Sequence, residues 1–142
     1  FAPGDLEDAL RLYRERFQPT EFGQAPRFML AVNVIVADSD AEAQRLRSSQ
    51  QISFARLRLG MPCLLPPPVD DVLEAIPVRI LPTVNAALAV SAVGSPDTVA
   101  AELDRLIARH QPDELILVGN IYDQATRHRS FAMAAEILRA RA

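Results

Sequence analysis

Two short polar clusters contain the residues whose types and spacing could support chemistry. Gly94 and Ser95 follow a small apolar run, and GNIYD, residues 119–123, follows a second one. A glycine and a serine that open a helix can bring backbone amides and a hydroxyl close to an anion. The same residues also suit a turn and a helix cap, and Asp123 suits a cap for the helix that follows it. Spacing alone leaves both interpretations open.

The stretch 90–123 reads as strand, helix, strand, and this unit would bring the two clusters to one edge of a sheet. Its helix places Val99, Leu103, Leu106 and Ile107 on one face. Ser95 can cap this helix by accepting a hydrogen bond from a first-turn amide. In parallel α/β units, functional groups collect beyond the carboxyl ends of the strands. The candidate site residues are therefore Gly94, Ser95, Asn120, Tyr122 and Asp123.

The remaining elements follow from hydrophobic periodicity and from the positions of glycine and proline. The segment 28–37 is the clearest strand, and Asn33 is its one polar member: either an amide satisfied within the sheet or a residue that faces a ligand. Helices are predicted at 5–17, from the Asp38–Asp40 cluster to Gly60, at 70–76, after Pro82 and at 124–141. An irregular insert covers about 60–89 and contains the stiff run Pro66–Pro68.

Isolated charged side chains give little sign of chemistry. The arginines Arg45, Arg47, Arg56 and Arg58 fit a solvated helix face. His110 and His128 are interpreted as surface residues of helices, not as general bases. The sequence contains no pattern of paired carboxylates, no triad of a nucleophile with histidine and aspartate, and no metal-ligand spacing.

Composition excludes several classes of partner. The net charge is −3 and all fifteen basic residues are scattered arginines, so nucleic acid is not an expected partner. No apolar run approaches the roughly eighteen residues that span a membrane. Cys63 is the single cysteine and has no disulfide partner, which favours a reducing, cytoplasmic environment.

Strands that alternate with helices predict an α/β fold with a parallel sheet, here a single domain over 1–142. Three strands are too few for a closed barrel and leave two open sheet edges. Because the chain opens on Phe1-Ala2-Pro3 in place of a methionine, we expect it to be either trimmed or a segment of a longer protein.

The chain resembles the C-terminal part of a luciferase-like, flavin-dependent monooxygenase of the bacterial luciferase family, a (β/α)8 TIM-type barrel family. The resemblance extends from FAPGDLEDALRLYRERFQPT through NVIVADSDAEAQRL and LLPPPVDD to VGSPDTVAAELDRL, DELILVGNIYDQATRHRS and FAMAAEIL. No single motif is diagnostic, but their order and spacing together are fairly specific. The resemblance implies that 28–37, 90–93 and 114–118 are the last three strands of an incomplete barrel.

The resemblance also implies an activity, in which reduced FMN and O2 insert one oxygen atom into a small organic substrate. A separate flavin reductase would supply the reduced FMN, and deazaflavin F420 is an alternative cofactor. Gly94 and Ser95 would approach the cofactor, and Asn120, Tyr122 and Asp123 would lie on the substrate side. About five strands of such an enzyme are absent, so the chain is expected to be inactive without the N-terminal half, and open edges favour a homo-oligomer such as a dimer.

Two other hypotheses belong to different functional classes. The chain could be a stand-alone small α/β ligand-binding or regulatory domain without catalysis, which predicts a pocket that is complete within these residues. It could also be a structural or interaction domain, with Pro66–Pro68 or an apolar surface as its contact.

Overall fold

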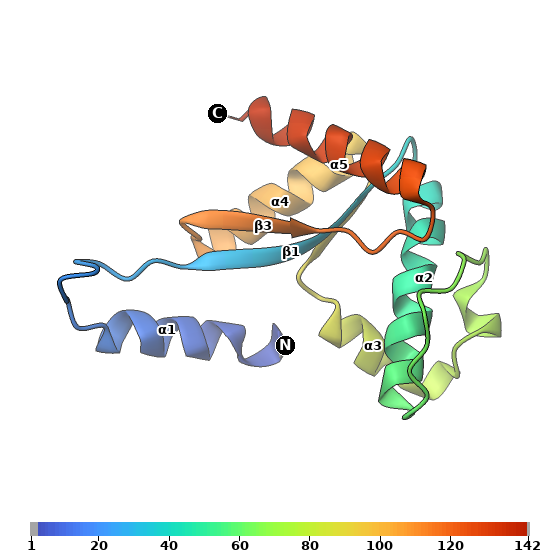
Figure 1. The fold of residues 1–142 in the computed structure, drawn as a ribbon, viewed down its shortest axis with the longest axis horizontal. Helices are drawn as coiled ribbons and strands as arrows, with labels where there is room; N and C mark the ends of the chain where they lie inside the picture. The colour runs from blue at the N-terminus through green and yellow to red at the C-terminus, as the bar shows by residue number, and fades with distance from the viewer. Residues whose placement is uncertain (1–2, 142) are drawn as a thin grey trace.

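The computed structural model describes residues 3–141, in which three strands and five α-helices alternate along the chain (Figure 1). Phe1 and Ala2, on which the expectation of a trimmed or partial chain rests, lie outside the described residues. The elements are α1 (Leu6–Arg16), β1 (Met29–Val36), α2 (Asp40–Arg58), α3 (Leu81–Ala87), β2 (Ser91–Gly94), α4 (Pro96–His110), β3 (Glu114–Val118) and α5 (Gln124–Arg139), with 3-10 turns at Pro3–Asp5, Val72–Glu74 and Val78–Ile80. The predicted alternation of strands and helices is confirmed.

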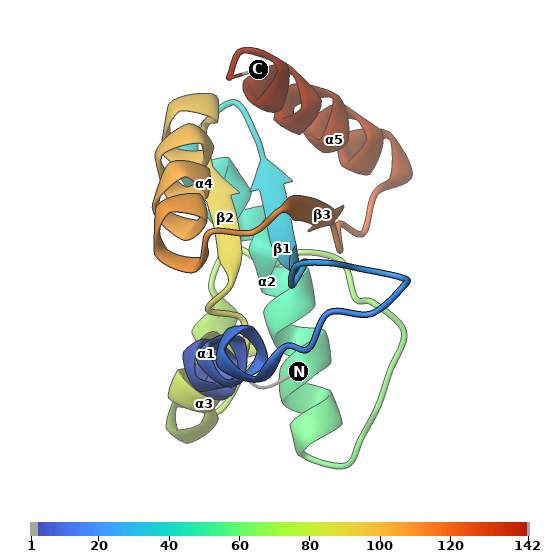
Figure 2. The same cartoon turned by 90° about the vertical axis from the view of Figure 1, so that its left-hand side faces the viewer.

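The three strands form one parallel sheet in the order β2-β1-β3 (Figure 2). In an arc of a sequentially built barrel, β2 would lie between β1 and β3. Here β1 pairs with a strand along each of its edges: Ile35 is in register with Val93 of β2, and Ala31 is in register with Ile116 of β3. The parallel α/β prediction therefore holds, but these strands do not form the consecutive barrel arc that the resemblance implied.

One face of the sheet is covered by α4 and α5. Figure 1 shows both helices above β1 and β3, with α1 below them. Alternate β1 residues point into this layer and are fully buried against the inward face of α4, as the helical periodicity predicted. The buried members of this core are Leu30, Val32, Val34, Val36, Val90, Ala92, Val99, Leu103, Leu106 and Ala134.

The opposite face of the sheet is covered only toward the carboxyl ends of its strands. There Ile35 and Val93 pack with Ala43 and Leu46 of α2. Toward the amino ends, Met29 of β1 and Ile116 of β3 are 57% and 46% exposed. This uncovered area, defined by Met29, Ala31, Asn33, Ile116 and Val118, is called the open face below.

Helix α2 begins at the predicted acidic cluster because the Ser39 side chain accepts a hydrogen bond from the Glu42 amide. It ends at Arg58, shortly before Gly60, as the sequence predicted. Four consecutive polar residues in its middle turns, residues 48–51, are nonetheless buried. Ser48 accepts a hydrogen bond from the Val69 amide at 2.8 Å, and this contact ties the insert to the helix.

Three predicted helix boundaries need correction. The short helix expected at 70–76 is only a 3-10 turn, Val72–Glu74, because Asp71 caps that turn and Pro77 disfavours helix in the residue before it. Helix α3 begins at Leu81, before Pro82, since proline is tolerated in a first turn. The last helix ends at Arg139.

Candidate functional site

The turns after the three strands meet at one edge of the sheet because all three strands are parallel. Val36 is in register with Gly94, whereas Val118, the last residue of β3, is in register with Asn33. Strand β1 therefore extends three residues beyond the end of β3. The two sequence clusters lie on opposite sides of β1, since β1 separates β2 from β3.

The first cluster is bound by a carboxylate of this chain. The Ser95 amide donates a hydrogen bond of 2.7 Å to Asp40 Oδ1, and this bond, together with Thr98, lowers the pKa of Asp40. Asp40 starts α2 and Ser95 precedes α4, so the contact joins two adjacent turns. A side chain at position 94 would place its Cβ 2.6 Å from Asp40 Oδ1 and from Thr98, which explains the glycine.

The Ser95 side chain does not cap α4 as the sequence predicted. Its hydroxyl bonds to the Thr98 hydroxyl at 3.1 Å, and no first-turn amide donates to it. The Asp40 carboxylate instead supplies the negative charge that the positive end of α4 favours.

The second cluster divides among three environments. Asn120 lines a hollow on the open side of the sheet, and Ile121 is buried beside α2. Tyr122 is 56% exposed. Asp123 caps α5 as predicted: its carboxylate accepts from the Thr126 amide at 2.8 Å and from the Thr126 hydroxyl, and these bonds lower its pKa. Asn120 is thus the member of this cluster that faces a cavity.

The cavity that Asn120 lines, called the amide hollow below, has a volume of about 350 Å³. It lies where the open face meets α2 and α3, and it combines three amide side chains with an apolar lining and no charged group. Its lining residues are Ala31, Val32, Asn33, Gln50, Phe54, Ala87, Leu88, Val118 and Asn120.

The amide of Asn33 is satisfied within the protein, which was the first of the two interpretations that the sequence left open. Its Oδ1 accepts a 2.8 Å hydrogen bond from Gln50 Nε2, and its Nδ2 donates to the Val90 carbonyl at 3.4 Å. Asn33 also lines the amide hollow. Packing and hydrogen bonding therefore hold two of the three amides in place before any ligand binds.

A second hollow, of about 250 Å³, adjoins the first and shares Gln50, Phe54 and Asn120 with it. Leu57 and Leu65 add apolar surface there. Gln50 and Phe54 were not predicted as site residues. The polar run SSQQ in a helix with an apolar face could have indicated Gln50, because polar side chains that are buried require specific hydrogen-bond partners.

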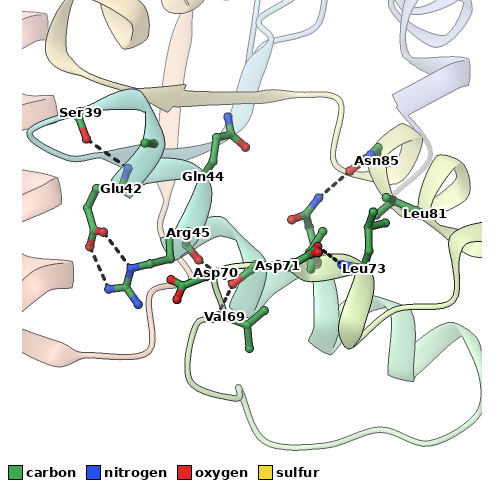
Figure 3. Close-up of a pocket in the computed structure, with 14 residues that line it drawn as sticks. Ser39, Glu42, Gln44, Arg45, Val69, Asp70, Asp71, Leu73, Leu81 and Asn85 are labelled. Atoms are coloured by element: carbon green, nitrogen blue, oxygen red, sulfur yellow. Dashed lines mark hydrogen bonds and ion pairs between the residues drawn. The ribbon is translucent and has the colours of Figure 1, made fainter.

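A larger groove, of about 760 Å³, lies between α2 and the insert (Figure 3). Two pairs of its polar side chains are bonded to each other: Glu42 holds Arg45 at 2.8 Å, and Gln51 Nε2 donates to Asn85 Oδ1 at 2.8 Å (Figure 3). We therefore interpret this groove as the contact region between α2 and the insert. We favour the amide hollow as the candidate site.

Several single-residue expectations can now be compared with the structure. His128 is exposed as predicted, but the surface assignment of His110 is wrong, because its side chain is 6% exposed. Arg47 departs from the predicted solvated arginine face: it is half-buried, its buried Nε has no hydrogen-bond partner within residues 3–141, and burial lowers its pKa. Cys63 is exposed.

Two classes of site find no support in residues 3–141. No group of three or more histidine, cysteine, aspartate or glutamate side chains is arranged to hold a metal ion in this part of the chain. None of the described helices combines the length and the apolar character needed to cross a membrane.

Comparison with known proteins gives a consistent result, although no protein-family model matches the chain. A protein of Escherichia coli (strain K12) named luciferase-like monooxygenase is 34% identical over 137 residues, which are 96% of this chain and 41% of that protein. A Bacillus subtilis (strain 168) protein named uncharacterized protein YvbT gives the same identity and coverage. The chain thus spans about two fifths of the length of these relatives.

A solved structure extends this similarity to the fold. The crystal structure of apo-MsnO8 superposes with a TM-score of 0.74 at 28% sequence identity. The match covers 96% of this chain and 42% of that one. The arrangement of strands and helices described above therefore corresponds to part of a larger fold.

Proposed function

We propose, on the premise that this chain is the C-terminal part of a luciferase-like protein, that it forms one wall of the pocket of a flavin-dependent monooxygenase. Such an enzyme would use reduced FMN and O2 to insert one oxygen atom into an organic substrate. The observation that carries the proposal is the open face, which ends in the amide hollow where the sheet meets α2 and α3.

The length of the relatives supports a shared pocket. An apolar sheet face that retains 57% exposure at Met29 and 46% at Ile116 is a surface that folding normally covers. The matched relatives are more than twice as long as this chain. We propose that the preceding part of the protein covers the open face and that activity requires it.

The phosphate of FMN fits poorly at the predicted Gly94–Ser95 position. The Ser95 amide is bonded to Asp40, and a second anion there would meet that carboxylate. The prediction that Gly94 and Ser95 contact the cofactor is thereby limited to uncharged parts of it. Phosphate contacts are assigned to the part of the protein outside this chain.

The flavin ring system fits the amide hollow better. Flat rings with an apolar body and polar edges suit a lining of Phe54, Val118 and Leu88 that also contains Asn33, Gln50 and Asn120. These residues would hold the ring edge or the adjoining substrate. When bound, the reduced flavin would supply the oxygen chemistry. The protein would bind the flavin, orient the substrate and exclude water.

The lining of the amide hollow contains no titratable side chain. This wall therefore contributes hydrogen bonds and apolar contact and does not move a proton. Tyr122 and Asp123 remain predicted substrate-side residues, although Asp123 is engaged in capping α5. F420 in place of FMN, a separate flavin reductase and a homo-oligomer also remain proposals.

The test joins the 142-residue chain to the N-terminal portion of the Escherichia coli relative and compares FMN binding with that of the chain alone. We expect micromolar FMN binding only for the joined protein. Asn120→Ala should weaken FMN binding in it, whereas Gln44→Ala, an exposed amide of the same fold, should not. Micromolar binding by the folded 142-residue chain alone would overturn the proposal in favour of a stand-alone ligand-binding domain.

A further inference from the structure

Helix α1 is held against the C-terminal end of α4 by charged contacts. Arg14 Nη2 donates hydrogen bonds of 2.9 Å to the carbonyl oxygens of both His110 and Gln111. Two turns earlier on α1, Glu7 forms an ion pair with Arg109. Gln111 adopts a left-handed backbone with φ 47°, which ends the helix and turns these carbonyls toward α1. A cation at the negative pole of α4 is favourable, so these contacts dock α1.

The His110 imidazole lies inside this docking contact. Its side chain is 6% exposed, and Nδ1 is buried with no hydrogen-bond partner among the described residues. Two hollows, of about 310 and 460 Å³, flank the contact, and both are lined by Glu7, Arg109 and His110. The ring is therefore enclosed by groups from α1 and α4 together.

The surroundings of His110 favour the neutral ring. A proton on Nδ1 would create a buried donor without an acceptor, which is costly. Arg105 and Arg109 of α4 and Arg14 of α1 would repel the added charge, and only Glu7 would attract it. Glu7 is already paired with Arg109.

We propose that His110 makes the docking of α1 sensitive to protons, so that α1 is held while the imidazole is neutral and is released when it becomes charged. This inference does not depend on the proposed monooxygenase function. It rests on the buried, unpaired Nδ1 at the point where Arg14 and Glu7 attach α1 to α4.

The pH window follows from the direction of the shift. Burial, followed by repulsion from Arg109, lowers the pKa of docked His110 below the ordinary value of 6.5. Docking is therefore complete above about pH 6.5 and weakens as the pH falls toward the pKa of docked His110. Over this range the equilibrium constant for docking falls by up to about tenfold per pH unit. Arg109 holds the pKa of Glu7 below its ordinary 4.5, so loss of that ion pair comes at lower pH.

The test is a titration of the 142-residue chain between pH 7.5 and 5 by nuclear magnetic resonance. We expect His110 to titrate below its ordinary pKa of 6.5, and the amide signals of α1 to report loss of docking over the same range as His110. Titration of His110 at or above pH 6.5, or α1 amide signals that do not change over the range in which His110 titrates, would overturn the proposal.

Two variants separate proton sensing from simple packing. His110→Gln should keep α1 docked down to pH 5. Glu7→Gln should weaken docking at every pH and should keep a loss of docking between pH 7 and 5, because His110 is still present. If His110→Gln does not fold, the wild-type comparison of the His110 titration with the α1 amide signals still decides. A loss of α1 docking in His110→Gln at the wild-type midpoint would contradict the proposal.

Discussion

The two faces of the sheet differ in how completely other elements of the chain cover them. The face under α4 and α5 buries β1 side chains such as Val32 and Val34 completely. The open face exposes Met29 and Ile116 and holds the amides of Asn33 and Gln50 at its boundary. Strand β1 contributes side chains to both faces. The contrast therefore comes from the elements that pack against each face and not from the sequence of the strand.

This contrast indicates which face stabilises the fold and which is the face that we propose to be functional. Full burial of aliphatic side chains against two helices supplies folding free energy. Amides held by mutual hydrogen bonds beside exposed apolar surface are typical of a ligand pocket wall. Matched substitutions on the two faces should therefore change the free energy of unfolding by different amounts.

The largest contrast is expected for shortened side chains. Leu103→Ala should lower the free energy of unfolding by about 2–5 kcal/mol, because it leaves a cavity in a closed core. Ile116→Ala, which shortens a 46% exposed side chain, should cost less than about 1 kcal/mol. Urea denaturation of both variants measures the difference. Equal losses would remove the distinction between the faces, and a larger Ile116→Ala loss in the joined protein would sharpen it.

Enlarged side chains test the same distinction from the opposite direction. Ala92→Leu overfills the covered face, where Ala92 is fully buried, and should cost about 1–3 kcal/mol. Ala31→Leu adds the same atoms to the open face and should change the free energy of unfolding by less than about 0.5 kcal/mol. Thermal unfolding of the two variants provides the measurement; a destabilised Ala31→Leu chain would mean that the open face is already packed.

The amide contact at the edge of the open face should contribute stability as well. Gln50→Leu leaves the Asn33 oxygen without its 2.8 Å donor and should cost about 1–3 kcal/mol. Gln44→Leu, on an exposed turn of the same helix, should be nearly neutral. Denaturant unfolding of both variants compares them. If Gln50→Leu were stabilising, the two amides would not form a fixed wall.

The smallest effects concern the carboxylates that close the turns beyond the sheet. Hydrogen bonds lower the pKa of Asp40 and of Asp123 below the ordinary 3.8, so each stabilises the fold above that pH and loses this contribution as the pH falls below it. Asp40→Asn and Asp123→Asn should each lower Tm at pH 7 and flatten its dependence on pH below 4. A Tm difference from wild type that stays constant from pH 7 to pH 2 would contradict this.

The sequence predicted what depends on local pattern. The apolar run at 114–118 and the i, i+4, i+7 spacing of Val99, Leu103 and Leu106 specified a strand and a helix that the structure confirms. The Asp123 cap was also predicted, because a cap bonds to an amide three residues away.

Features that join distant segments were not predictable in this way. The central position of β1 depends on which strands pair, and the bond between Asp40 and Ser95 spans 55 residues. The pairing of Gln50 with Asn33 and the burial of His110 likewise depend on packing between elements. For the candidate site, the sequence identified Asn120 and noted Asn33, but it missed Gln50 and Phe54 because nothing local places them beside the sheet.

The central claim is that the open face, with its amide hollow, is where this chain meets a flavin. The most direct test is a titration of the isotope-labelled 142-residue chain with FMN up to millimolar concentration, followed residue by residue by nuclear magnetic resonance. The account predicts weak binding, with shifts at Ala31, Ile116, Val118 and Asn120 and none at Val99 or Leu103. Shifts confined to the groove of Figure 3 or to the covered face, or no shift at any FMN concentration, would contradict it.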